Sequence, residues 1–229
     1  MKIIVIGDVH GHDSWKRLLA RENNEFDKII FLGDYLDGFN TSKKKIKENF
    51  YEILKFKEEQ GDKCILLLGN HDWHYVSFGE RYSGWSNDTF RWANLAVKDC
   101  LENETIKILH REDDILFTHA GITKTWMRYW FESDNPNKLQ FINYKDLSPK
   151  ALNFTYGDSF SEYGDTVYSS PIWVRPASLL KDKIDGFKQV VGHTMMNTLA
   201  NQNEVWFCDT MPREYLVIED NKFIIKNLN

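Results

Sequence analysis

Carboxylate, imidazole and amide side chains recur where three short apolar runs end in the first third of this 229-residue chain. The first run ends in Gly7–Gly11 (GDVHG), the second in Gly33–Gly38 (GDYLDG) and the third in Gly69–Asp72 (GNHD). In open α/β sheets, loops at the carboxyl ends of parallel strands meet in one crevice. We therefore expect the polar side chains of these three loops to converge on one site.

Two later apolar runs end in Thr118–Gly121 (THAG) and Gly192–Thr194 (GHT), which add two histidines. Grouping Asp8, Asp34 and Asp37 without cations costs several kcal/mol per poorly solvated charge, and divalent ions remove that cost. The mixture of imidazole, carboxylate and amide suits Mn, Fe or Zn better than Ca, which prefers oxygen ligands. One such loop alone is more often a turn, and a lone histidine is more often structural. Five such loops, each after a strand, predict a metal centre.

The elements that must position these loops alternate between apolar runs and helical patterns. Helices are expected at Ser14–Asn23, at Asp88–Glu102 and over a longer stretch that Thr41 or Ser42 could cap. Continuous apolar strands separated by helices predict a parallel sheet covered on both faces. The expected strands are Lys2–Ile6, Lys28–Leu32, Cys64–Leu68, Ile106–Leu109, Ile115–Thr118, Gln189–Val191, Val205–Cys208, Leu216–Ile218 and Lys222–Ile225.

The strand signals crowd together after residue 187, where Asp220-Asn221 predicts a hairpin and hence a late antiparallel segment. Residues 123–170, rich in aromatics and in Asn, Ser and Asp, are predicted to form a helical and loop insertion that shapes the pocket. No repeat or Pro/Gly linker divides the chain, so we expect an α/β fold in one domain over residues 1–229.

Composition narrows the class of protein. Hydrophobic residues make up 42% and charged residues 28%, as in globular enzymes. A net charge of −5 argues against broad neutralisation of nucleic-acid phosphates, although it leaves a small anionic substrate open. No stretch approaches the roughly twenty apolar residues of a membrane span, and no signal peptide is evident, so we expect no membrane partner. Three widely spaced cysteines without a CxxC pair fit a reducing cytoplasm.

Taken together, the loops GDVHG, GDYLD, GNHD, THAG and GHT resemble those of the calcineurin-like metallophosphoesterases, over Gly7 to Thr210. Trp173–Pro176 (WVRP) makes the chain look closest to the phosphoprotein phosphatase branch, with its small bacterial or phage-type serine/threonine phosphatases and related diadenosine tetraphosphatases. The diesterase branch usually has a second histidine where this chain has Met195. The resemblance implies a β-sandwich flanked by helices in α/β/β/α layers.

The resemblance also implies two divalent metal ions, with Mn²⁺ the first expectation and Fe or Zn as alternatives. Asp34 would bridge the two ions, and a hydroxide between them would be the nucleophile. Coordination lowers the pKa of water from 15.7 to about 7, which supplies that nucleophile at neutral pH. The metal ligands carried over are Asp8, His10, Asp34, Asn70, His119 and His193.

His71 stands at the family's general-acid position, where it would protonate the leaving alkoxide while Asp37 orients its ring. The alternative for Asp37 is a cap near Asn40. Arg175 is the candidate phosphate clamp, because a guanidinium can engage two oxygens, and its alternative is a surface arginine. Asn70 is expected to contact substrate as well as metal.

Several positions depart from the branch. Gly38 stands where an arginine is usual, so one phosphate contact is missing unless Arg81, Arg91 or Arg213 replaces it. Asp72 replaces the usual glutamate, and Met211 follows Asp209-Thr210 where glycine is usual. The rings of Trp73–Trp92 are either core or a lip that stacks a base or a peptide. The basic run Lys43–Lys47 is expected to be a solvated helix face.

The leading functional hypothesis is hydrolysis of phosphate monoesters, on phosphoserine or phosphothreonine or on small molecules. The first alternative is a nucleotide hydrolase of the diadenosine tetraphosphatase type, or a phosphodiesterase. The second, from another class, is a non-catalytic interaction module, which the complete ligand set with His71 and Asp37 disfavours. The sequence carries no signal for the oligomeric state.

Overall fold

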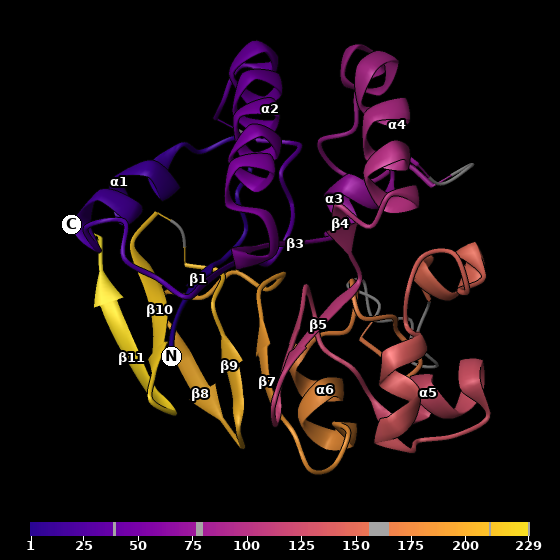
Figure 1. Cartoon of the computed structure of the whole chain (residues 1–229). Helices are drawn as coiled ribbons and strands as arrows, with labels where there is room; N and C mark the ends of the chain where they lie inside the picture. Colours follow the sequence, from indigo (N-terminus) through magenta and orange to yellow (C-terminus); the bar gives the residue numbers. More distant parts are fainter. Residues whose placement is uncertain (39, 77–79, 156–164, 211, 229) are drawn as a thin grey trace.

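The computed structural model describes residues 1–38, 40–76, 80–155, 165–210 and 212–228, and within it two mixed β-sheets pack face to face (Figure 1). In order across the sheet, the six-stranded sheet contains β11 (Lys222–Asn227), β10 (Glu214–Glu219), β1 (Lys2–Ile6), β2 (Lys28–Phe31), β3 (Cys64–Leu67) and β4 (Ile106–Lys107). The five-stranded sheet contains β5 (Leu109–Glu112), β6 (Ile115–Thr118), β7 (Lys188–Val191), β9 (Val205–Phe207) and β8 (Ala200–Gln202).

Helices cover the outer faces of both sheets. α1 (Ser14–Arg21), α2 (Lys43–Gln60) and α4 (Asn87–Glu102) share a core cluster with the outer face of the six-stranded sheet. α6 (Pro176–Asp182) packs through Leu179 on the five-stranded sheet. The remaining helical segments are α3 (Asn70–Trp73), α5 (Lys124–Phe131) and the 3₁₀ turns η1 (Gly61–Lys63), η2 (Pro136–Phe141) and η3 (Pro149–Leu152).

Strand β1 shows why its apolar run is continuous. Ile3 and Val5 belong to the core between the sheets, whereas Ile4 and Ile6 belong to the core beneath the helices. Because successive side chains of a strand point to opposite faces, both faces must be apolar. The α/β/β/α layers that the resemblance implied are confirmed.

The parallel arrangement expected of the early strands is confirmed, but the later strands do not all join their sheet. β1, β2, β3 and β4 are parallel, but β6, β7 and β9 form the centre of a second sheet. The predicted hairpin is present between β10 and β11, where Asp220 and Asn221 have φ of 49° and 62°. Ser42, rather than Thr41, caps α2 by accepting a hydrogen bond from the Lys45 amide at 3.3 Å.

Four elements differ from the sequence-based expectation. The strand expected over Ile106–Leu109 divides at Ile108, because the chain crosses there from one sheet to the other. β8, α3 and α6 were not predicted; each has seven residues or fewer. The segment expected to be an insertion contains α5, η2 and η3, and its residues 156–164 lie outside the described part.

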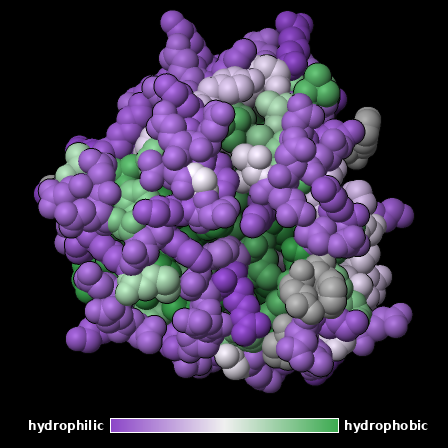
Figure 2. Space-filling view, in the orientation of Figure 1, coloured by the Kyte–Doolittle hydropathy of each residue, from purple (hydrophilic) through white to green (hydrophobic). Residues whose placement is uncertain are grey.

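Hydrophilic residues cover most of the face shown in Figure 2. The basic run on α2 follows this pattern: Lys43 and Lys44 are exposed and form ion pairs with Asp88 and Glu48. Among the described residues, no helix is both long and apolar enough to cross a bilayer.

Candidate active site

The loops after β1, β2, β3 and β7 meet around a cavity of about 210 Å³. His119, in the loop after β6, is fully buried and contacts this group through Asn70. Four of the site residues, His10, Asp34, Asp37 and His193, have positive φ, a strained conformation that accumulates at functional sites. The cavity is lined by Asp8, His10, Asp34, Asn70, His71, Arg175, His193, Met195 and Asp209.

Asn70 and two histidines supply a cation-binding donor set. Asn70 Oδ1 lies 2.9 Å from both His119 Nε2 and His193 Nδ1. The other ring nitrogens face the carbonyls of Leu32 at 2.8 Å and Trp173 at 3.1 Å, and these oxygens can only accept. The outward nitrogens therefore carry the protons, while the inward ones present lone pairs.

Burial reinforces this arrangement. It lowers the pKa of His119, and it lowers that of His193 well below the usual range, so both rings are neutral at pH 7. Three lone pairs from three loops then face one another, which is unfavourable without a cation between them. The residues present fit a divalent metal ion.

Asp34 occupies the position between the two halves of the ligand set. Its Oδ1 accepts a hydrogen bond from the His71 amide at 2.9 Å. Its Oδ2 lies 3.5 Å from His119 Nε2 on one side and 3.7 Å from His10 Nε2 on the other. His10 Nδ1 faces the Leu36 carbonyl at 3.2 Å, so its Nε2 is the nitrogen turned to the site.

Asp8 closes the ligand set from the first strand. It accepts the His193 amide at 2.9 Å, and burial followed by the charges of Asp209 and Asp34 raises its pKa well above the usual range. Asp8, Asp34 and His119 place ligand atoms within 4.8 Å of one another. Such crowding of buried carboxylates requires a compensating positive charge.

Two further acidic residues support the site, one of which, Asp209, was not among the expected site residues. Asp209 lines the cavity, and burial raises its pKa to about 6; the Asp209-Thr210 match was the available signal. Asp72 is fully buried and accepts the backbone amides of Asp34, Tyr35, Leu36 and Gly69 at 2.9 to 3.2 Å. It therefore fixes the loop that carries Asp34, which agrees with the supporting carboxylate that the resemblance implied at this position.

Glycines allow the backbone to approach the ligands. A Cβ on Gly69 would overlap Asp34 Oδ1, and one on Gly192 would overlap Asp8 Oδ1. Gly38 is also confined, because a Cβ there would overlap the His10 carbonyl and lie 2.9 Å from Thr41 Cβ. A larger residue at position 38, such as the arginine that the resemblance would lead one to expect, does not fit unless this loop moves.

His71 and Asp37 form a pair beside the ligand set. His71 Nδ1 lies 3.2 Å from Asp37 Oδ2. Burial disfavours the charged imidazole, but Asp34 and Asp37 outweigh it and raise the pKa of His71 to about 8. The His71 side chain keeps 15% of its surface exposed and lines the cavity, as a proton donor requires.

Arg175 is the arginine that lines the cavity, at the N-cap of α6 with Nη1 3.2 Å from Thr194 Oγ1. The candidates to replace the missing arginine do not line it. Arg81 lies over the Trp85 ring, and Arg91 pairs with Asp88 at 3.9 Å. Arg213 donates to the Met196 carbonyl at 2.7 Å and lowers the pKa of Asp209 against the effect of burial, so its charge acts on the site.

The aromatic stretch is mainly core at its start. Trp73 and Tyr75 are buried, whereas Phe78 lies outside the described residues. Tyr82 meets Trp173 edge to face, with ring centroids 4.5 Å apart, and Trp173 in turn meets His193 at 5.7 Å. These rings pack against the His193 imidazole.

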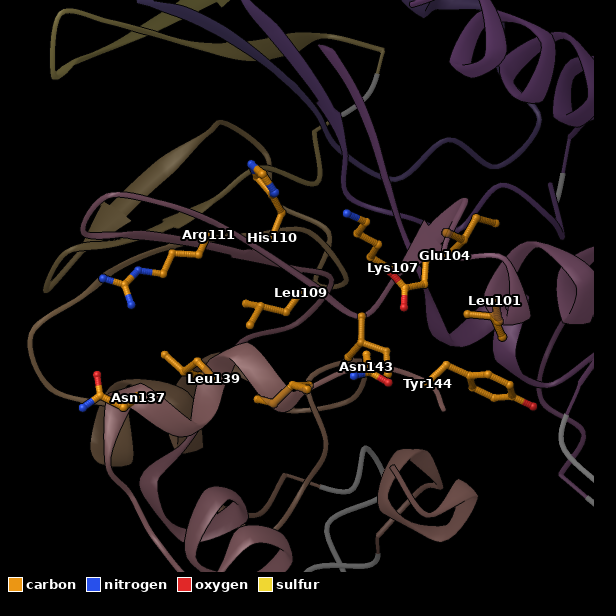
Figure 3. Close-up of a pocket in the computed structure, with 13 residues that line it drawn as sticks. Leu101, Glu104, Lys107, Leu109, His110, Arg111, Asn137, Leu139, Asn143 and Tyr144 are labelled. Atoms are coloured by element: carbon orange, nitrogen blue, oxygen red, sulfur yellow. The ribbon is translucent and has the colours of Figure 1, made fainter. Parts of the chain in front are cut away.

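A larger cavity, of about 420 Å³, lies between the β4–β5 crossing and η2 (Figure 3). Leu109 and Leu139 face one another across it. Its polar side chains are exposed or already paired: Asn143 donates to Asp146, and Arg111 Nε donates to the Asp113 carbonyl. It contains no residue of the ligand set.

Two sheets that present imidazoles, carboxylates and an amide at their strand ends define a candidate metal-binding scaffold. The model of the calcineurin-like phosphoesterase family matches residues 1–197, and the chain belongs to that family.

Curated relatives carry one activity in their names. The chain is 26% identical over 178 residues to the symmetrical bis(5'-nucleosyl)-tetraphosphatase of Psychromonas ingrahamii, which covers 72% of this chain and 60% of that protein. It is 28% identical over 171 residues to the Erwinia tasmaniensis protein of the same name, covering 69% and 58%. The chain thus spans about 60% of the length of these relatives.

Solved structures show the same fold. A serine/threonine phosphatase from Saccharomyces cerevisiae superposes with a TM-score of 0.58 at 15% identity, covering 99% of this chain and 79% of that one. A candidate diadenosine tetraphosphatase superposes with a TM-score of 0.54 at 14% identity, covering 99% and 93%.

Proposed function

We propose that this protein hydrolyses phosphate monoesters with the help of two divalent metal ions. The observation that carries the proposal is the meeting of Asn70, His119 and His193 at 2.9 Å, with Asp34 beside them and the His71–Asp37 pair facing the same cavity. Asp8 and His10 with Asp34 would hold one ion. Asn70, His119 and His193 with Asp34 would hold the other.

Bound divalent cations, with Mn²⁺ as our first choice and Fe or Zn as alternatives, supply an activated water and offset charge on the phosphoryl oxygens. The side chains of this protein do the rest. His71, held by Asp37 through Nδ1, donates the Nε2 proton to the leaving oxygen. Arg175 binds phosphoryl oxygens and thereby aligns the phosphorus with the ligand set.

The size of the cavity favours a monoester. At about 210 Å³ it is smaller than the roughly 300–1,000 Å³ pockets that enclose a drug-sized ligand. A phosphoryl group would enter, while the rest of the substrate stays outside. That arrangement fits phosphoserine or phosphothreonine proteins and small phosphate monoesters. Met195 lines the cavity where the diesterase branch usually has a second histidine, which also favours a monoester.

Hydrolysis of dinucleoside tetraphosphates is the second candidate, and the names of the curated relatives favour it. Its leaving group is a nucleotide rather than an alcohol, but the same residues would serve. The chain spans about 60% of the length of those relatives, so the parts of the relatives that contact the second nucleoside need not be among the matched residues.

The decisive experiment compares turnover of p-nitrophenyl phosphate, bis-p-nitrophenyl phosphate and diadenosine tetraphosphate by metal-stripped protein reloaded with Mn²⁺. We expect metal-dependent cleavage, chiefly of the monoester. A preference for the dinucleotide would select the second candidate. Absence of turnover on all three, with two ions bound, would overturn the proposal in favour of a binding module.

We also propose that the protein works in a reducing cytoplasm. Cys64, Cys100 and Cys208 are all buried and unpaired, and burial raises the pKa of each thiol. Labelling with a thiol reagent under native conditions should be slow, and a disulfide in protein purified without reductant would contradict this.

A further inference from the structure

Asp37 is surrounded by more hydrogen-bond donors than a pair with His71 requires. Its side chain is 1% exposed. Tyr75 donates its hydroxyl to Oδ1, and His71 Nδ1 lies 3.2 Å from Oδ2. His74 Nε2 lies 2.5 Å from Oδ2 as a close polar contact, at an angle outside that of a hydrogen bond. Both carboxylate oxygens are thus held, and two of the three partners lie outside the cavity.

The contacts of His74 determine which of its nitrogens carries the proton. The Tyr82 amide donates to His74 Nδ1 at 3.3 Å, so Nδ1 presents a lone pair. The neutral ring therefore carries its proton on Nε2, the nitrogen that faces Asp37. His74 also stacks on Tyr82, with ring planes 5° apart and centroids separated by 5.9 Å.

Tyr75 is fixed in the same way. Its ring is buried and stacks on Trp85, with planes 17° apart. Its hydroxyl accepts a hydrogen bond from the Ser86 amide at 3.2 Å, which leaves the hydroxyl proton for Asp37. The tyrosine can therefore act on Asp37 only as a donor.

The loop before α4 closes this arrangement. A Cβ on Gly84 would lie 2.7 Å from Asp37 Cβ, so the loop packs directly on the carboxylate. The same loop supplies the two amides, from Tyr82 and Ser86, that orient His74 and Tyr75. Asp37 itself sits in a strained backbone conformation with φ of 63°, which needs such support.

We propose that Tyr75 and His74 are positioning residues that hold Asp37 so that His71 presents its Nε2 proton to the leaving group. The inference rests on the proposed function, because it assigns His71 as the proton donor. Without the two outer donors, the Asp37 carboxylate can rotate about χ1 and χ2, and the His71 ring loses its anchor. The His74 amide donates to the Asn70 carbonyl at 3.2 Å, a backbone contact that a side-chain substitution keeps, so we expect metal and substrate binding to be unaffected.

Tyr75→Phe tests this directly, since it keeps the ring and removes the hydroxyl. We expect kcat to fall about tenfold on phenyl phosphate, whose leaving group needs a proton, and much less on p-nitrophenyl phosphate, whose leaving group does not. KM and metal content should stay as in the unmodified protein. Equal losses of kcat on both substrates would overturn the proposal.

Tyr215→Phe is the matched control. Tyr215 is also buried and also donates its hydroxyl to a buried carboxylate, Glu22, at 2.6 Å, but it does not line the site. It therefore reproduces the loss of stability without touching Asp37. A leaving-group effect in Tyr215→Phe as large as that in Tyr75→Phe would contradict a local role.

His74 gives an independent arm. His74→Phe keeps the stacking on Tyr82 and removes the donor, whereas His74→Gln retains a donor. We expect the selective loss on phenyl phosphate in the first variant and partial recovery in the second. Equal activity of the two variants would remove His74 from the proposal.

A readout without turnover separates this inference from the proposed function. In imidazole ¹⁵N NMR, the His71 Nδ1–H signal, assigned by its loss in His71→Asn, should exchange faster with water in Tyr75→Phe and not in Tyr215→Phe. Absence of turnover in the unmodified protein with this NMR pattern intact would refute the proposed chemistry but keep the positioning. An unchanged signal in Tyr75→Phe would refute the positioning.

Discussion

Two buried carboxylates in this protein have similar surroundings and different consequences. The Glu22 side chain is 5% exposed, with Lys2 at 2.8 Å, Lys226 at 2.7 Å and the Tyr215 hydroxyl at 2.6 Å. Asp37 is 1% exposed and held by two imidazoles and the Tyr75 hydroxyl. In both, burial opposes the charged form, yet the partners lower the carboxyl pKa.

The difference between the two carboxylates is whether a partner has a further polar atom that faces the cavity. Lys2, Tyr215 and Lys226 come from β1, β10 and β11, and their contacts with Glu22 join these strands to the end of α1. Among the described residues, the charged or hydroxyl groups of these partners thus serve only to bind Glu22. His71 has a second ring nitrogen and lines the cavity. Burial and charge alone therefore do not distinguish a structural carboxylate from one that serves a reaction.

The largest expected effect is at Asp34, which joins the ligand set to the His71 side of the site. Asp34→Asn should release both ions together and reduce kcat by about a thousandfold, because bound metal supplies several kcal/mol of transition-state stabilisation. Metal analysis and turnover check this. Retention of two ions would show that Asp34 does not bridge them.

His71→Asn should lower kcat by about a hundredfold or more while metal content is unchanged, because only the proton donor is lost. Measuring kcat with metal analysis on the same sample tests the assignment. Loss of metal in this variant would place His71 among the ligands and remove the contrast with Glu22.

Arg175→Ala should raise KM for monoesters roughly tenfold with a smaller change in kcat, since a charge-assisted hydrogen bond to substrate is worth about 1.5–3 kcal/mol. Arg91→Ala, at an exposed position of α4, is the control. Unchanged KM would mean that Arg175 does not bind the phosphoryl group.

Glu22→Gln should leave turnover unchanged and lower stability by about 2 kcal/mol, or roughly 5 °C in Tm, because hydrogen bonds to a charged group are lost. Thermal unfolding of the loaded protein measures it. A loss of turnover at a temperature where the variant is folded would show that Glu22, like Asp37, affects the reaction and is not only structural.

The smallest effect depends on pH. Burial opposes ionisation of Glu22, but Lys2, Lys226 and Tyr215 lower its pKa from 4.5 to about 2. A depressed folded-state pKa contributes stability that is fully present above 4.5 and is lost as pH falls toward about 2. The stability difference between the unmodified protein and Glu22→Gln should therefore shrink across that interval, and a difference that grows would contradict it.

Sequence patterns located the loops because their signals are local. Each glycine and ligand sits beside its own apolar run, so Asp8, Asp34 and Asn70 could be placed at strand ends without knowledge of the sheet. Pairing is not local. The apolar run of β6 (ILFT) is similar to that of β1 (KIIVI), and nothing within either run states which sheet it joins.

The parts of the site that could not be predicted depend on long-range contacts or weak patterns. β8 is three residues long and mostly exposed, so no periodicity marks it. Tyr75 and His74 looked like members of an aromatic stretch, because their partner Asp37 is 38 and 37 positions away. Arg213 is held by the Met196 carbonyl and acts on Asp209 through its charge, an arrangement that residue types do not encode.

The contact between Asp8 and the His193 amide spans 185 positions of the chain. On a ribosome, Asp8 would emerge long before His193: at about 5–20 residues per second, the interval is roughly 10 to 40 seconds. The nascent chain therefore exposes an incomplete set of ligands during most of its synthesis. A metal ion that needs both Asp8 and His193 can therefore be bound only after the later loop has been made, so the binding of such an ion reports that the two ends of the ligand set have come together.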